Sequence, residues 1–284
     1  MFHPSTIQLL RFHFSLFLLP VYLFALSQLP SVDVGNAAIV FFILHVLVYP
    51  ASNGYNSFMD RDTAPIGGLE SPLPPTRQLF YVTVGMDAVA IGLSFLVTPL
   101  FAAGVGLYIA ASRAYSYRGI RLKRFPVLGF LTVFLFQGAL VFYLSYHGSS
   151  AVHSLRVPLL PLLLASLLIG ALYPLTQVYQ HAADRADGVE TLSSLLGYRG
   201  TFLFSALLFG AATAGFYFLF GAGHLNYWVG FLVSTGPAVG FFLYWMTSVW
   251  RNEAAANFRN SLRMNVLATL GTTAFFITLN LLRT

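Results

Sequence analysis

The stretch YPASNGYNSFMDRD, Tyr49–Asp62, ends a long apolar run, and an altered copy, YPLTQVYQHAADRAD, ends another at Tyr173–Asp187. Both copies fit the pattern Y-P-x-[ST]-[NQ]-x-Y-[NQ]-x-x-x-D-R, and together they hold four of the chain's nine acidic residues. A polar helix end at a membrane surface would explain either copy alone, but the repeat at fixed spacing favours a paired functional site. We therefore expect one domain over residues 1–284 that carries a candidate internal repeat at 49–62 and 173–187.

Each copy places two amides and one carboxylate at matched helical spacing: Asn53, Asn56 and Asp60 in the first, and Gln177, Gln180 and Asp184 in the second. At about 100° per residue, the three side chains of each copy lie within roughly 60° of one another on a helix. Stripes of oxygen ligands at helix ends suit a hard cation such as Mg²⁺, which keeps some of its waters and often bridges to a phosphate.

The chain outside the two motifs is too apolar for a soluble domain of 284 residues, because 57% of it is hydrophobic and only 8% is charged. An apolar run of about 20 residues spans a bilayer as a helix, and strand-like alternation is absent. We expect an all-α, polytopic membrane protein with about nine transmembrane helices in a bundle around a central cavity. The predicted spans are 7–28, 36–59, 77–98, 99–117, 126–147, 157–183, 197–221, 226–249 and 260–282.

The composition excludes several kinds of chemistry. There are no cysteines, so disulfides, thiolate catalysis and Cys-ligated zinc are ruled out. The net charge of +6 does not indicate nucleic-acid binding, because the basic residues gather at the predicted membrane edges. The first apolar run is too long for a cleavable signal peptide.

The basic residues also predict the orientation, since Lys and Arg in short loops favour the cytoplasmic side. Thirteen of the fifteen fall on one side of the predicted bundle: Arg11, Arg61, Arg77, Arg113, Arg118, Arg121, Lys123, Arg124, Arg185, Arg199, Arg251, Arg259 and Arg263. Only Arg156 and Arg283 fall on the other. We expect an integral, multi-pass protein of a bacterial inner membrane, with the N-terminus and both motifs cytoplasmic.

Two prolines and two loops extend the paired pattern. Pro50 and Pro174 precede the polar stripes by about one turn, and a proline inside a helix usually kinks it. The loops that follow the motifs, 60–77 and 184–199, share a Gly-Leu/Val-Glu-Ser/Thr segment. We expect the kinks to tilt both motifs toward one cavity and the two loops to cap it.

The loop from Ser112 to Pro126 is the most basic part of the chain and suits phosphate groups, although an anchor at the membrane edge is the simpler explanation of its charge. Asp87 is the one acidic residue near the middle of a predicted span, so it is a functional candidate that either faces the cavity or pairs within the bundle. We expect the external histidines to be loop residues without a specific role: His147, His153 and His224.

At its motifs the chain resembles the UbiA superfamily of intramembrane prenyltransferases, with N-x-x-x-D-x-x-x-D on the second and D-x-x-x-D on the sixth of nine helices. Asn56-Ser-Phe-Met-Asp60 is similar to the start of the first motif, and Gln180-His-Ala-Ala-Asp184 occupies the second. Tyr115-Ser-Tyr-Arg-Gly-Ile-Arg121-Leu-Lys123 resembles the family loop Y-S-x-x-P-x-R-L-K.

The chain departs from the family pattern at three positions, which leaves its site less acidic. Ala64 stands where the first motif ends in Asp, Gln180 replaces the first Asp of the second motif, and Ser71 replaces the Arg of the family's R-P-L-P.

The resemblance implies that Mg²⁺ bridges the two motifs to an isoprenyl diphosphate. The candidate metal ligands are Asn56, Asp60, Asp62, Gln180 and Asp184. The candidate diphosphate ligands are Arg61, Arg121, Lys123, Asn53 and Gln177. The candidate catalytic residues are Asp60, Asp184 and Tyr179. We expect the rings of Tyr179 and Tyr55 to stabilise an allylic cation through their π faces.

The function that the resemblance implies is transfer of an isoprenyl group to a small-molecule acceptor, for which we expect an aromatic compound, within the bilayer. A membrane terpene cyclase, in which the chain's own double bond is the nucleophile, is the first alternative. A transporter is the second, because paired polar helices interrupted by proline also suit a transport site. The expected partners are the isoprenyl diphosphate, the acceptor and the lipid bilayer, and no nucleic acid.

Overall fold

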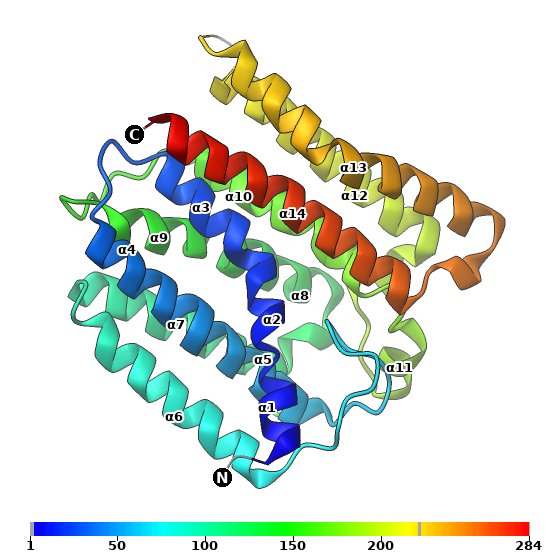
Figure 1. Cartoon of the computed structure of the whole chain (residues 1–284). Coiled ribbons are helices and arrows are strands. Elements are labelled where there is room, and N and C mark those ends of the chain that lie inside the picture. Colours follow the sequence, from blue (N-terminus) through cyan, green and yellow to red (C-terminus); the bar gives the residue numbers. More distant parts are fainter. Residues whose placement is uncertain (1–2, 221–222, 284) are drawn as a thin grey trace.

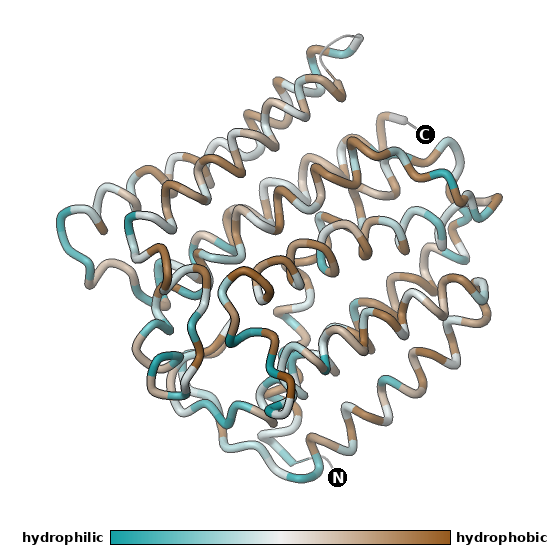
Figure 2. Tube along the Cα trace, turned by 180° about the vertical axis from the view of Figure 1, so that it is seen from behind, coloured by the Kyte–Doolittle hydropathy of each residue, from teal (hydrophilic) through white to brown (hydrophobic). Residues whose placement is uncertain are grey.

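The structure is a computed structural model that describes residues 3–220 and 223–283. In these residues the chain is all helical, with no β-strand and only two isolated bridges, Val32–Ser150 and Ile66–Leu69. The long helices run side by side in one bundle (Figure 1). Figure 2 shows apolar residues along the helices and hydrophilic residues concentrated in the connecting loops, as expected for helices that face lipid.

The helices are shorter and more numerous than the apolar runs, because several spans are interrupted. Those of the first half are α1 (Pro4–Leu10), α2 (Phe12–Ser15), α3 (Leu19–Ser27), α4 (Val34–Phe41), α5 (Tyr49–Asp60), α6 (Arg77–Ser94) and α7 (Pro99–Ser116). Those of the second half are α8 (Pro126–Val133), α9 (Val141–Ser149), α10 (Leu159–Leu172), α11 (His181–Ala186), α12 (Leu192–Phe220), α13 (Leu225–Arg251) and α14 (Phe258–Arg283).

Seven helical segments in the described residues are long and apolar enough to cross a membrane: Pro4–Ser27, Val34–Asp60, Pro126–Ser149, Leu159–Thr176, Leu192–Phe220, Leu225–Arg251 and Phe258–Leu282. The predicted count of about nine is therefore approximate. The other two predicted spans correspond to α6 and α7, which contain the charged residues Asp87 and Arg113. The last residue of the predicted span 197–221 lies outside the described residues.

Both motif prolines lie where the chain departs from α-helical geometry. Pro50 is in the first turn of α5, directly after a π-helical turn at Phe42–Val48. Pro174 lies in a 3₁₀ turn, Tyr173–Thr176, that ends α10. A proline has no N–H to donate and crowds the preceding turn, so these interruptions are the expected consequence of the sequence.

Aromatic side chains close the end of the bundle away from the motifs. Phe24 of α3 is fully buried, and its ring centroid lies 4.8 Å from Phe276 of α14, 5.1 Å from Phe142 of α9 and 5.2 Å from Phe216 of α12. Aromatic pairs of this kind contribute about 0.5–1.5 kcal/mol each beyond the area they bury. These ring contacts pack the four helices against one another in the core.

Candidate active site

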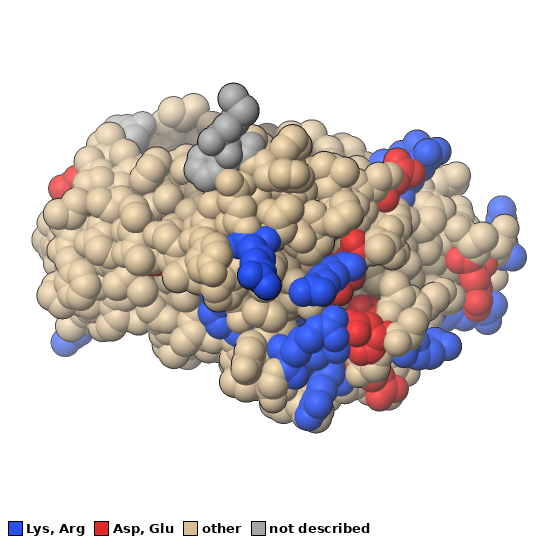
Figure 3. Space-filling model, turned by 90° about the horizontal axis from the view of Figure 1, so that it is seen from below, with Lys and Arg blue, Asp and Glu red and all other residues tan. Residues whose placement is uncertain are grey.

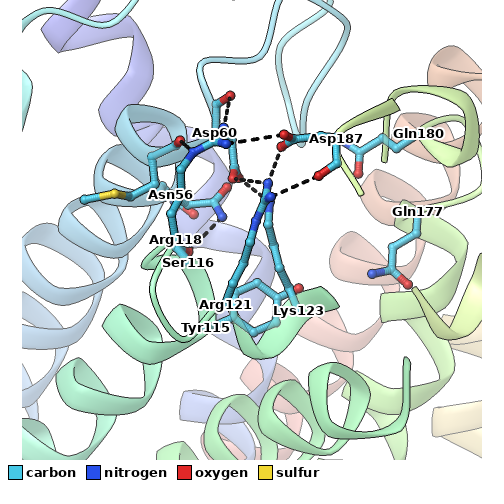
Figure 4. A network of polar contacts seen from close by, with 12 residues as sticks. Asn56, Asp60, Tyr115, Ser116, Arg118, Arg121, Lys123, Gln177, Gln180 and Asp187 are labelled. Atoms are coloured by element: carbon cyan, nitrogen blue, oxygen red, sulfur yellow. Dashed lines mark hydrogen bonds and ion pairs between the residues drawn. The ribbon is translucent and has the colours of Figure 1, made fainter. Parts of the chain in front are cut away.

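A polar cavity of about 250 Å³ lies at the end of the bundle where α5 and α10 finish. Residues of both sequence motifs line it: Asn53, Asn56, Asp60, Asp62, Gln177, Tyr179, Gln180 and Asp184. Residues 124 positions apart in the sequence therefore face one space, and Figure 4 shows the two groups of side chains across the ion-pair network that joins them. We call this space the polar cavity.

The first motif keeps the predicted register because α5 remains a regular α-helix to Asp60. Asn56 donates a hydrogen bond to the Ser116 hydroxyl of α7, with Nδ2 and Oγ 2.9 Å apart, which fixes the direction of the amide. Asp60 is only 8% exposed. Arg61 follows in the left-handed conformation, with φ of 55°, and turns the chain out of the helix.

The basic loop between α7 and α8 supplies cations to Asp60. Lys123 donates a hydrogen bond to Asp60, with Nζ and Oδ2 2.5 Å apart, and a guanidinium nitrogen of Arg121 lies 3.5 Å from the other carboxylate oxygen. Arg121 also pairs with Asp187, which Arg118 approaches to 3.4 Å (Figure 4). The loop is thus an electrostatic part of the site, beyond any role as an anchor at the membrane edge.

Two of the predicted diphosphate ligands do not line the polar cavity. Arg121 is buried behind Asp60 in the ion-pair network. Arg61 is exposed to solvent because the left-handed turn after Asp60 directs the chain away from the cavity. Figure 3 shows Lys and Arg gathered with Asp and Glu on one side of the molecule. Of the three cations predicted to bind the diphosphate, only Lys123 lines the polar cavity.

The second motif does not form the continuous helix that the predicted span 157–183 requires. The chain passes from α10 through the 3₁₀ turn and further turns, and α11 begins only at His181. The backbone N–H of Gln177 donates to the backbone carbonyl of Pro174, and the backbone N–H of Gln180 donates to the backbone carbonyl of Gln177. Because these bonds span three residues instead of four, the second stripe does not repeat the geometry of the first.

The side chains of the second motif still reach the cavity. Gln177 is 6% exposed and donates to the hydroxyl of Tyr173, while Gln180 donates to the carbonyl of Pro65 in the loop after α5. His181, which the sequence places beside this stripe, points away from the cavity and bonds to Ser193 at 2.8 Å. The Gln180 side chain therefore connects the second motif to the loop that follows the first, while the Gln177 side chain bonds within its own motif.

Three carboxylates near the cavity differ in their proton affinity. Burial, followed by the neighbouring Asp60 carboxylate, raises the pKa of Asp62. Burial raises the pKa of Asp184 to about 6, with Lys123 opposing the shift. Asp187 has a pKa below its ordinary value, because its hydrogen bond to Arg121 and the nearby cations outweigh the effect of burial. Asp184 is thus the carboxylate that titrates nearest to neutral pH.

The structure also places residues in the cavity wall that the sequence reasoning did not assign. Tyr115 of α7 and Tyr173 share a hydrogen bond between their hydroxyls, and Ser116 holds Asn56. Arg11, at the break between α1 and α2, lines the cavity as a buried cation. Tyr115 and Ser116 begin the loop motif that resembles the family, so the sequence carries a signal for them, whereas it marks Arg11 only by its charge near a membrane edge.

Asp87 and Tyr55 do not line the polar cavity. Asp87 pairs with Arg113 on the neighbouring helix, which resolves its two alternatives in favour of a pair within the bundle. The Arg113 guanidinium lies 3.9 Å from the centroid of the Tyr55 ring, so Tyr55 is occupied as a partner of that cation and does not face the cavity. Of the two tyrosines expected to stabilise an allylic cation, only Tyr179 is in the wall.

Two of the histidines predicted to be external have more contacts than expected of loop residues. His147 is 2% exposed and contacts the Thr98 hydroxyl at 2.9 Å, while Thr98 accepts a hydrogen bond from the backbone N–H of Phe101 at the start of α7. His147 therefore helps to cap α7, and the His153 ring lies beside it at a tilt of 46°.

The residues of the polar cavity fit a divalent cation that prefers oxygen. One oxygen each of Asp60, Asp184 and Gln177 is buried without a hydrogen-bond partner. No group of three His, Asp or Glu side chains in residues 3–220 and 223–283 is close enough to form a complete metal site. Magnesium is commonly held by one or two carboxylates with waters and substrate phosphates, so an incomplete protein site is compatible with it.

A second cavity, of about 240 Å³, meets the first at Phe17, Ile169 and Leu172. Its walls are mainly aliphatic and aromatic side chains of α3, α10, α12, α13 and α14, and they include Ser205, whose buried hydroxyl has no hydrogen-bond partner. The hydroxyls of Thr235 and Thr272 in this wall donate to carbonyls of their own helices. This space therefore offers contacts to hydrocarbon, and we call it the apolar cavity.

The fold and the paired site define the protein as a helical bundle embedded in the membrane. A family model for the UbiA prenyltransferase family matches residues 15–267, and the chain belongs to this family. It is an integral membrane protein. None of the curated protein sequences compared with the chain matches it.

Solved structures of UbiA homologues share the fold. A homologue from Archaeoglobus fulgidus bound to DMAPP and Mg²⁺ is 16% identical, with a TM-score of 0.71 over 97% of this chain and 98% of that chain. The same homologue bound to GPP and Mg²⁺ gives a TM-score of 0.69 at 16% identity over 97% and 99%. A homologue from Aeropyrum pernix K1 is 21% identical, with a TM-score of 0.69 over 94% and 98%.

Proposed function

We propose that this protein transfers an isoprenyl group from an isoprenyl diphosphate to a small-molecule acceptor within the membrane, in a reaction that depends on Mg²⁺. The observation that carries the proposal is the polar cavity, in which oxygen ligands from two distant motifs and the cation Lys123 face one space. The similar structures whose ligands include an isoprenyl diphosphate and Mg²⁺ support the choice of substrate and metal.

Asn56, Asp60, Gln180 and Asp184 would hold Mg²⁺ with the diphosphate, and Asp62 would contribute when it is ionised. The metal would neutralise the diphosphate oxygens as the bond between carbon and oxygen breaks. Lys123 adds a fixed positive charge at the cavity wall, where negative charge develops on the leaving group. Asn53 and Gln177 would orient the diphosphate from either side, and Arg121 would keep Asp60 in place.

The apolar cavity is the proposed site of the isoprenyl chain, because it adjoins the polar cavity and most of its wall offers hydrocarbon contacts. Tyr179 would face the allylic cation from the polar side, where its ring packs edge-on against Phe258 at 5.4 Å. We propose an aromatic acceptor, whose ring would attack the cation and then lose a proton to restore its aromaticity.

A larger side chain in the wall of the apolar cavity is expected to limit the length of the isoprenyl chain that the protein accepts. Gly210 lines this cavity at an exposed position of α12, and a Cβ built there meets no atom within 4 Å, so a leucine adds bulk to the cavity wall without a clash. Gly210→Leu should lower kcat/KM for geranylgeranyl diphosphate at least about tenfold relative to dimethylallyl diphosphate, since steric rejection of this kind is worth one to two orders of magnitude. Gly240→Leu, on the exposed face of α13, is the matched control and should leave the ratio unchanged. An unchanged ratio in Gly210→Leu would mean that the isoprenyl chain does not bind in the apolar cavity.

Two other functions remain as candidates to be tested. A cyclase would ionise the same diphosphate without an acceptor, and a transporter would bind a substrate without breaking it. The deciding experiment incubates purified protein with isoprenyl diphosphates of several lengths and Mg²⁺, with and without a phenolic acceptor. Prenyl transfer requires an acceptor-dependent product, a cyclase gives a cyclic product without acceptor, and a transporter releases no pyrophosphate.

We propose that the chain forms one domain in a bacterial inner membrane, with both motifs cytoplasmic. Because the native chain has no cysteine, single cysteines report topology cleanly. Cysteine at exposed Ser71 or Ala186 should resist an impermeant thiol reagent added outside intact cells, whereas cysteine at Val152, which is 79% exposed in the opposite loop, should react. The reverse labelling pattern would invert the proposed orientation.

A further inference from the structure

Arg11 interrupts the first membrane span at the level of the polar cavity. Its backbone is left-handed, with φ of 48° and ψ of 52°, so α1 ends there and α2 begins at the next residue. A non-glycine residue adopts this conformation only when its surroundings stabilise it. The side chain is nevertheless buried, with 5% exposed, and it lines the cavity.

The Arg11 guanidinium connects two other segments to this break. One terminal nitrogen donates to the carbonyl of Gly67 at 3.0 Å, and the other donates to the carbonyl of Asn53 at 3.0 Å. Gly67 belongs to the loop after α5, while Asn53 belongs to the polar stripe of α5 itself. A planar guanidinium with fixed donor directions suits such a bridge better than a lysine ammonium does.

The loop fits closely against the broken helix. A Cβ at Gly67 would lie 2.6 Å from Cζ of Phe14, so a larger residue there would displace the loop. Gly68 has φ of +82°, and its carbonyl lies 3.1 Å from the His13 ring. Ile66 is 5% exposed and packs with Leu9, Leu10 and Leu79.

This loop also forms part of the wall of the site. Asp62, Ile66 and Gly67 line the polar cavity, and Gln180 of the second motif donates to the carbonyl of Pro65 at 3.3 Å. We call residues 61–70 the cap segment. We propose that Arg11 is a positioning residue that holds the cap segment over the polar cavity through Gly67, while it fixes α5 through Asn53.

The consequence for chemistry rests on the proposed function. An allylic cation that meets water forms a carbon–oxygen bond and loses a proton to give the free isoprenyl alcohol, whereas capture by the acceptor gives the prenylated product. A cap segment held by Arg11 excludes water from the cavity. Loosening it should raise the ratio of alcohol to prenylated product, which a general loss of folded protein would not change.

The first test measures closure without any substrate. Ile66→Cys introduces the chain's only thiol, at a buried position of the cap segment. We expect this thiol to react slowly in the otherwise native protein and about tenfold or more faster after Arg11→Gln, because hydrogen bonds from a charged donor are stronger than neutral ones. Gly67→Ala should have the same effect without altering Arg11. Arg199→Gln, which removes an exposed arginine of α12, is the matched control and should leave the rate unchanged.

The second test measures the product ratio of the same variants without the cysteine. Arg11→Gln and Gly67→Ala should both increase the fraction of isoprenyl alcohol, and Arg11→Lys should restore it only in part, because one ammonium does not reproduce the planar bridge. Native labelling rates in both variants would overturn the proposal, and full recovery by Arg11→Lys would show that only charge matters. If no isoprenyl diphosphate is turned over, the proposed function fails, while the labelling rates still decide the role of Arg11.

Discussion

Replacing Asp60 by asparagine is expected to reduce turnover at least about 100-fold at saturating Mg²⁺, in line with the loss of one group at an electrostatic site. Asp60 is buried in the wall of the polar cavity and receives a hydrogen bond from Lys123. The neutral amide keeps the shape of the carboxylate but removes the charge that would hold the metal. Pyrophosphate release from an isoprenyl diphosphate, measured over a range of Mg²⁺ concentrations, gives the effect.

Asp87→Asn is the matched control for Asp60→Asn. Asp87 is also a buried carboxylate paired with a cation, but its partner is Arg113 and it does not line the cavity. Removing one member of such a pair destabilises a protein because the other charge is left buried, so Asp87→Asn should lower the melting temperature. Its turnover should fall far less than that of Asp60→Asn. Equal losses of turnover in the two variants would mean that Asp60 acts through folding and not through the site.

The helical architecture and the first motif could be predicted from the sequence because local patterns determine them. Apolar runs long enough to span a bilayer have few alternatives to a helix. Asn53, Asn56 and Asp60 keep their predicted stripe because α5 is regular up to Asp60. The side chains of the second motif also line the cavity, but helical spacing does not explain their positions, because the helix predicted to carry them is interrupted.

The rest of the site depends on contacts between distant residues, which spacing does not reveal. The turns after Pro174 replace a helix with bonds that span three residues, and their course depends on packing against neighbouring helices. Arg61 and Arg121 both have a positive φ, which sends one to solvent and the other behind Asp60. Asp87 finds its partner 26 residues away on α7, and no pattern in the sequence distinguishes that arginine from the others nearby.

Asp184 and Asp187 lie three residues apart at α11, and their substitution by asparagine is expected to have opposite effects on stability. Asp184 has its pKa raised to about 6, so between its ordinary pKa and about 6 the folded protein holds a proton that the unfolded chain has released. The free energy of unfolding therefore falls as the pH rises through that window, and the ionised carboxylate opposes folding at every higher pH. Asp184→Asn should raise the melting temperature at neutral pH and change it little at about pH 4.

The ionised carboxylate of Asp187 has the opposite effect on stability, because Arg121 and the neighbouring cations keep its pKa below the ordinary value. Its carboxylate stabilises the fold above the ordinary pKa, and this contribution is lost as the pH falls. Asp187→Asn should therefore lower the melting temperature at neutral pH. Thermal unfolding of both variants and of the native protein, measured from about pH 4 to pH 8, tests both signs.

For turnover, we expect Asp184→Asn to be the more damaging of the two substitutions, although it is the one expected to raise stability. Asp184 has an oxygen buried without a hydrogen-bond partner and lines the cavity, so Asp184→Asn should lower turnover at least about 100-fold despite its greater stability. Asp187 does not line the cavity, and its variant should retain most of the activity. At subsaturating Mg²⁺, native turnover should rise as the pH passes through about 6, because the proton on Asp184 competes with the metal. A more stable Asp184→Asn with native turnover would exclude Asp184 from the metal site, because the loss of a metal ligand must lower turnover.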